Sequence, residues 1–96
     1  MSKRWYNFLM KEVVVESVSS PNCHNCRIFE EFWHSIESQY PNVKYRNISV
    51  IDSEGAEMAS RYGIFVSPGI IINGELFSVG GVDKDKFTQK IKELSD

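Results

Sequence analysis

The sequence has no excess of charge of either sign. Its 96 residues include 11 Lys and Arg and 13 Asp and Glu, which gives a net charge of −2. Proteins that bind nucleic acid present a basic surface, so we expect no nucleic-acid partner. No apolar run approaches the roughly 20 residues of a membrane-spanning helix. The apolar segment 5–10 is interrupted by Asn7 and is too short for the core of a signal peptide. We therefore expect a cytoplasmic protein with no membrane partner.

Cysteine is almost absent as well, and both cysteines lie in one motif, Cys23-His24-Asn25-Cys26. Residues three apart on a first helical turn are neighbours, so this spacing can close a disulfide without moving the backbone. The free N–H groups and the positive end of a helix dipole favour a thiolate at Cys23. The motif predicts a thiol–disulfide redox site, with Cys23 as the attacking thiolate and Cys26 as the resolving thiol.

A metal site is the alternative for the same two cysteines. Zinc requires four ligands, and the remaining soft candidates, His24 and His34, give no recognised ligand spacing. We therefore expect no metal and no cofactor, although a metal shared between two molecules stays open. His24 has a second interpretation as a cation that stabilises the nearby thiolate, whereas His34 is expected on a helix surface.

The hydrophobic pattern predicts seven elements in the order β-α-β-α-β-β-α. β-branched and aromatic runs indicate strands, Asn73-Gly74 between two apolar runs indicates a hairpin, and apolar steps of three to four residues indicate helices. The expected strands are 12–18, 43–50, 70–72 and 75–79. The expected helices are 23–40, with Asn22 or a neighbour as its N-cap, a short one from Asp52 and Ser53 to Gly63, and one after Asp83.

Right-handed crossovers place the first two strands parallel, and the hairpin adds antiparallel strands. The predicted fold is α/β, with a central mixed sheet of about four strands flanked by helices on both faces. The cysteine motif then lies at the carboxyl end of a central strand, where such sheets place their sites. We expect one domain over residues 1–96, with residues 1–11 as a leading arm or short element.

With this order, residues 12–95 resemble the thioredoxin/glutaredoxin-like superfamily. Three motifs carry the resemblance: the Cys23–Cys26 turn, the segment Arg61–Pro68, and Gly80-Gly81-Val82-Asp83 before the last helix. The motifs also depart from the family. Pro21-Asn22 precede Cys23 where thioredoxins usually carry a Trp. The two residues between the cysteines, His24-Asn25, match neither the pair usual in thioredoxins nor the pair usual in glutaredoxins. These departures leave the partner and the reduction potential open.

The resemblance implies a small redox-active disulfide protein that reduces client disulfides, either as a thioredoxin-like enzyme or with glutathione as a glutaredoxin does. It further implies a cis Ser67-Pro68 peptide facing the disulfide, with substrate contacts from Ser67, Pro68, His24, Gly80 and Gly81. Expected partners are client proteins with disulfides and an upstream disulfide reductase or glutathione, acting on a monomer. A non-catalytic module that binds a partner or a metal is the remaining alternative.

Thioredoxins also carry a buried carboxylate beneath the resolving cysteine. Glu16 is the acidic residue on the strand before the motif, but the position counted back from Cys23 falls on Ser17. Glu16 would then face the opposite side of the sheet, so its role as a proton carrier stays open.

Overall fold

The computed structural model describes residues 10–96. The predicted arm over residues 1–11 lies almost wholly outside this range. Only residues 10 and 11 of this arm are described. Lys11 donates its backbone N–H to the Ser95 carbonyl, next to the start of the first strand. The described elements are β1 (Val13–Ser19), α2 (His24–Ile36), a 3₁₀ turn η1 (Glu37–Gln39), β2 (Val43–Ser49), α3 (Ser53–Tyr62), β3 (Gly69–Ile72), β4 (Glu75–Val79) and α4 (Lys84–Ser95). The predicted element order is confirmed.

The four strands form one mixed sheet in the order β2-β1-β3-β4. β1 runs parallel to β2 and antiparallel to β3, and β4 returns antiparallel on the outer edge of β3. The β3–β4 turn has both Asn73 and Gly74 at positive φ, as the Asn-Gly signal predicts. β1 is therefore a central strand, and its carboxyl end leads directly into the cysteine motif.

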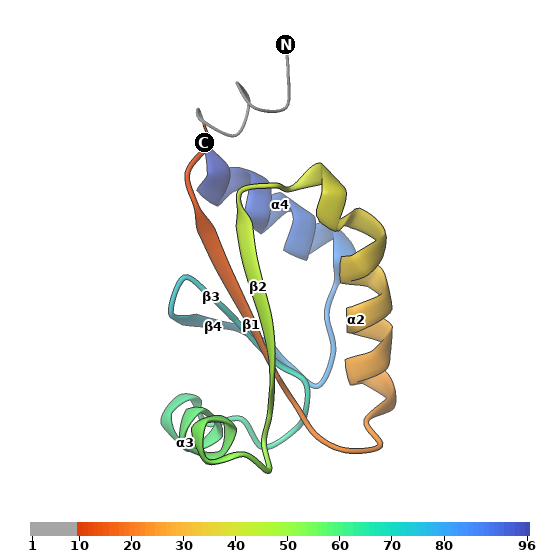
Figure 1. Cartoon of the computed structure of the whole chain (residues 1–96), viewed down its shortest axis with the longest axis vertical. Coiled ribbons are helices and arrows are strands. Elements are labelled where there is room, and N and C mark those ends of the chain that lie inside the picture. Colours follow the sequence, from red (N-terminus) through yellow and green to blue (C-terminus); the bar gives the residue numbers. More distant parts are fainter. Residues whose placement is uncertain (1–9) are drawn as a thin grey trace.

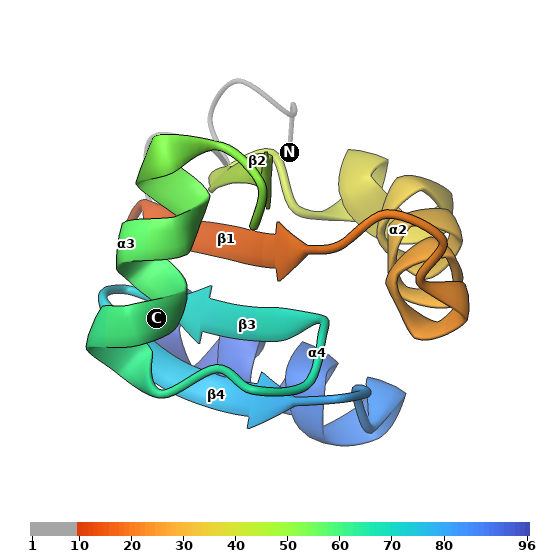
Figure 2. The same cartoon turned by 90° about the horizontal axis from the view of Figure 1, so that it is seen from below.

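Helices cover both faces of the sheet, which confirms the predicted layers. Figures 1 and 2 show α2 and α4 together on one face and α3 alone on the other. β1 contributes to both faces because successive side chains of a strand point to opposite sides. The core under α2 and α4 contains Val13, Val15, Phe29, Trp33, Tyr40, Ile70, Ile72, Phe87 and Ile91. The core under α3 contains Val18, Ile48, Met58, Ile64 and Ile71.

Two boundaries of the first helix differ from the prediction. Cys23 is the N-cap and lies outside the helix, while Asn22 takes a left-handed conformation with φ 58°. Asn accepts this conformation more readily than most residues, which lets the chain turn sharply into α2. At the other end, the α-helix stops at Ile36 and the chain continues as η1. None of the helices within residues 10–96 has the length and apolar character to span a bilayer.

Candidate active site

Cys23 and Cys26 form a disulfide at the start of α2, with their Cα atoms 5.2 Å apart. As the N-cap, Cys23 places its Sγ 3.1 Å from the backbone N–H of Cys26, which donates to it. Cys23 is half-buried, whereas Cys26 is only 5% exposed because it lies on the inner face of the first turn. The two sulfur atoms therefore differ in their access to solvent.

Ser67, from the second half of the chain, contacts the cysteine pair. Its hydroxyl lies 3.3 Å from the Sγ of Cys23 and donates to it, and 2.5 Å from the hydroxyl of Ser20. The Ser67-Pro68 peptide is cis, as expected, and Pro68 is buried where the chain enters β3. Two loops that are 47 residues apart in sequence thus meet at Cys23.

The glycine pair is joined to the cysteine motif through Asn25. The side-chain amide of Asn25 donates to the Gly80 carbonyl over 2.8 Å. Gly80 has φ 80°, a conformation that favours glycine. Gly81 lines a groove of about 240 Å³ with Ile28 and Phe32 of α2. Sequence reasoning assigned no role to Asn25, because its partner lies 55 residues away.

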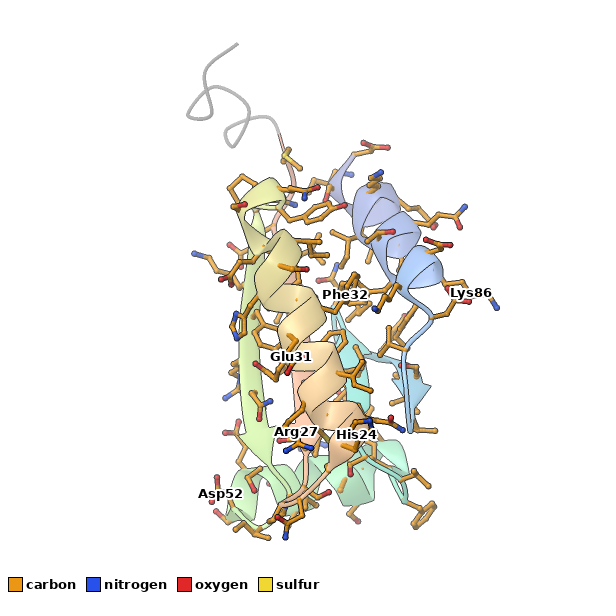
Figure 3. All side chains as sticks on the ribbon, turned by 90° about the vertical axis from the view of Figure 1, so that its right-hand side faces the viewer. His24, Arg27, Glu31, Phe32, Asp52 and Lys86 are labelled. Carbon is orange, nitrogen blue, oxygen red and sulfur yellow. A yellow bond between two sulfur atoms is a disulfide. The ribbon has the colours of Figure 1, made fainter. Side chains whose placement is uncertain are left out.

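His24 is exposed on the first turn of α2 and lies at the same end of the helix as Arg27 (Figure 3). His34 is exposed near the other end of α2, as expected for a surface residue. Its ring nitrogens lie 3.0 Å from a Glu30 oxygen and 3.3 Å from a Glu37 oxygen. The hydrogen bond to Glu37 and the charges of Glu37 and Glu30 raise the pKa of His34.

Glu16 does not approach the cysteine pair. Its carboxylate lies 2.7 Å from the guanidinium of Arg46, which also binds Glu54 at the start of α3. This network lies on the sheet face that α3 covers. The neighbouring residue Ser17 is fully buried and lies on the opposite face with Val15, under α2. The carboxylate considered for proton transfer is therefore directed away from Cys26.

A different carboxylate lies beside the cysteines. A pocket of about 280 Å³ is lined by residues from α2, from β2 and from the loop after β1, including Cys23, Cys26, Arg27, Glu30 and Asn47. Glu30 accepts a hydrogen bond from Asn47 over 2.6 Å and another from the phenol of Tyr45. Sequence reasoning missed Glu30, since no local pattern distinguishes it from Glu31, the other acidic residue of α2.

Comparisons with known proteins agree with this geometry. The family model for the thioredoxin domain matches residues 12–93. The chain belongs to the thioredoxin domain family. A thioredoxin from Methanocaldococcus jannaschii is 29% identical over 87 residues, covering 88% of this chain and 98% of that protein. A thioredoxin from Ophiophagus hannah is 26% identical over 85 residues, covering 85% of this chain and 79% of that protein.

Solved thioredoxin structures also share the fold. The crystal structure of thioredoxin NaTrxh from Nicotiana alata superposes with a TM-score of 0.73 at 21% identity, covering 100% of this chain and 89% of that one. The family match and the disulfide between Cys23 and Cys26 make the protein a thiol–disulfide oxidoreductase. The same matches do not favour the glutaredoxin alternative. Within residues 10–96, no three His, Cys, Asp or Glu side chains cluster in a way that could hold a metal ion.

Proposed function

We propose that the protein reduces disulfides of client proteins, with Cys23 as the attacking thiolate and Cys26 as the resolving thiol. The observation that carries this assignment is the unequal burial of the two cysteines. Cys23 is half-buried at the helix N-terminus, and Cys26 is nearly enclosed. The Cys23 thiolate attacks a client disulfide, so that a Cys23–client bond forms and one client thiolate leaves. The Cys26 thiolate then attacks Cys23, closes the internal disulfide and releases the second client thiolate.

Client binding is assigned to the rim around Cys23. Phe65 is 94% exposed and Val66 is 58% exposed, directly before Ser67 and Pro68. An extended client segment can pair with the free backbone groups of this loop and cover the two apolar side chains. Gly80 lies beside Val66 and donates its backbone N–H to the Pro68 carbonyl, and together with His24 and Gly81 it completes the proposed substrate surface.

The proposed partners follow from the same chemistry. The oxidised protein needs an upstream disulfide reductase to restore its dithiol, and the relatives named thioredoxin support this role. We place the reaction in the cytoplasm, where a lone cysteine pair is more often catalytic than structural, and assign it to a monomer of one domain over residues 1–96. Glutathione remains a second reductant to test.

The assignment is tested by trapping, which is our first prediction. In Cys26→Ser the resolving thiol is gone, so clients remain bound to Cys23 through mixed disulfides. Non-reducing electrophoresis with mass spectrometry should identify covalent complexes with several proteins. Cys23→Ser serves as the matched control and should trap almost nothing. Equal trapping by both variants would contradict the division of roles, and capture of glutathione alone would favour the glutaredoxin-type reaction.

A further inference from the structure

The proposed reaction requires a base for Cys26. A free thiol with its pKa near 8.5 is mostly protonated at neutral pH, and Cys26 attacks only as a thiolate. On β1, the residue beneath α2 at this point is Ser17, which has no carboxylate, and Glu16 faces Arg46 on the other side. The strand below the disulfide therefore supplies no proton acceptor of suitable acidity.

Glu30 occupies the position on α2 that can meet this need. It follows Cys26 by four residues, so the two side chains are neighbours on one helix face. Both line the 280 Å³ pocket beside the disulfide. A polar pocket of this size accommodates water molecules, each of which can bridge two groups by hydrogen bonds. Glu30 and Cys26 thus border one pocket that is large enough to hold a bridging water molecule.

The carboxylate is fixed in this place by residues of β2 and α2. From β2, Tyr45 and Asn47 both donate to one Glu30 oxygen. From α2, His34 lies 3.0 Å from the other oxygen and Arg27 lines the same pocket. Burial raises the pKa of the Tyr45 phenol, and its bond to Glu30 raises that pKa further, so Tyr45 remains a hydrogen-bond donor at neutral pH. With its side chain 26% exposed, Glu30 keeps contact with water while its orientation is restricted.

We infer that Glu30 is the proton acceptor for Cys26 and acts through water in the shared pocket. The Cys26 thiol transfers its proton to the Glu30 carboxylate, which gives a thiolate and a neutral carboxylic acid. The thiolate attacks Cys23 of the mixed disulfide, and the bond between Cys23 and the client breaks. The departing client thiolate then takes the proton from Glu30, so the carboxylate is regenerated with no external base. This inference rests on the proposed role of Cys26 as the resolving thiol.

The test separates the two cysteines in one stopped-flow trace. The reduced protein reacts with 5,5′-dithiobis(2-nitrobenzoate), and attack by Cys23 releases the first thionitrobenzoate. Attack by Cys26 on that mixed disulfide releases the second. A positioned base typically contributes about 10²–10⁴-fold to a rate. At pH 7, Glu30→Gln should therefore slow the second phase by about 10²-fold or more and leave the rate of the first phase within twofold. The matched control is Glu31→Gln, which removes an exposed carboxylate from the adjacent position of α2 (Figure 3) and should change neither phase.

The pH dependence distinguishes proton transfer from a structural effect. Above the pKa of the Cys26 thiol no base is required, so the second phases of Glu30→Gln and of the unmodified protein should converge. A deficit that persists unchanged at pH 10, or a second phase that Glu30→Gln does not slow, would overturn the role of Glu30. A single phase in the unmodified protein would instead overturn the assignment of Cys26. If Glu30→Gln fails to fold, Tyr45→Phe removes one donor to the same carboxylate, and an unchanged second phase in that variant would also count against the proposal.

Discussion

At the scale of single residues, the charge on Cys23 depends on a few hydrogen-bond donors. The N–H of Cys26 and the hydroxyl of Ser67 both donate to its sulfur, and the Ser67 hydroxyl also shares a hydrogen bond with the hydroxyl of Ser20. Hydrogen bonds to a charged acceptor are stronger than those to a neutral one. In the reduced protein, each donor is therefore expected to stabilise the thiolate more than the thiol.

Replacing Ser67 with Ala should raise the pKa of the Cys23 thiol in the reduced protein by about one to two units. A hydrogen bond to a charged group contributes roughly 1.5–3 kcal/mol, and one pKa unit corresponds to about 1.36 kcal/mol. The measurement is the pH dependence of the alkylation rate in a Cys26→Ser background. Ser60→Ala, which removes an exposed hydroxyl from α3, is the control and should leave the profile unchanged. An unaltered profile in Ser67→Ala would show that the helix end and the Cys26 N–H are enough to stabilise the Cys23 thiolate without Ser67.

How far these residues could be predicted depends on how local their signals are. The cysteine pair and Ser67-Pro68 stand in motifs that can be recognised along the chain. Asn25 and Ser20 make their contacts over 55 and 47 residues, and an Asn or Ser alone does not specify its partner. The role of Glu30 could not be predicted either, because only the folded sheet brings Asn47 to it.

At the scale of elements, α2 carries a pH-sensitive contact at its carboxyl end. His34 lies between Glu37 and Glu30, and its raised pKa means that the folded chain binds a proton more tightly there than the unfolded chain does. The stabilisation by the protonated ring is fully present below the unfolded pKa near 6.5. It is lost as the pH rises through the higher pKa of the folded state.

His34→Gln should therefore destabilise the protein at pH 5.5 and have almost no such effect at pH 9. Urea unfolding of the oxidised protein at both pH values measures the difference between the variant and the unmodified chain. Glu37→Gln removes the main cause of the raised pKa and should abolish part of the same pH-dependent difference. A stability loss of equal size at both pH values would indicate a contact that does not depend on the proton.

α3 packs unusually closely against the end of β2. A Cβ added to Gly55 would overlap the backbone carbonyl of Ser49, which cannot move away as a flexible side chain could. Gly55→Ala should destabilise the protein by about 1–3 kcal/mol, as overpacking does. This cost outweighs the gain of up to roughly 1 kcal/mol in helix propensity. Urea unfolding measures it, with Ser60→Ala on the exposed side of α3 as the control. An increase in stability for Gly55→Ala would mean that α3 can shift without loss.

The element order and the sheet were predictable because strand and helix periods differ along most of the chain. The end of α2 was not. The apolar positions Trp33, Ile36 and Tyr40 continue the spacing of an α-helix. The 3₁₀ turn η1 places Tyr40 on the same buried side as an α-helix would. In this turn the backbone N–H of Tyr40 donates to the Glu37 carbonyl, and the Tyr40 ring stacks on Trp33. A hydrophobic pattern alone does not separate the last turn of an α-helix from a 3₁₀ turn.

At the scale of the whole molecule, the site occupies one end of the sheet and is bordered by exposed apolar side chains. Phe65 and Val66 precede Ser67 and contribute little to either core, since both are largely exposed. Covering an apolar side chain with a partner contributes about 1.5–3 kcal/mol. These residues therefore bear on client binding and not on the stability of the fold.

Phe65→Ser should lower the rate of insulin disulfide reduction several-fold, because a bound polypeptide loses this apolar contact. The first phase of the reaction with 5,5′-dithiobis(2-nitrobenzoate) should stay within twofold, since a small disulfide requires no docking surface. Leu76→Ser changes an exposed apolar side chain on β4, beside the hairpin end of the sheet, and is the control. If both variants reduce insulin equally well, the segment before Ser67 is not the client surface.

The pairing of β1 with β3 has a consequence for insertions and deletions. Val15 is opposite Ile72 and Val18 is opposite Gly69. Extending this register two residues past Val18 and Gly69 places Ser20 opposite Ser67, where their hydroxyls meet. A single residue added to or removed from either segment would separate the two hydroxyls and displace Ser67 from Cys23, even if every original side chain were retained. The number of residues between the paired strands and the disulfide is therefore as much a part of the site as their chemical identity.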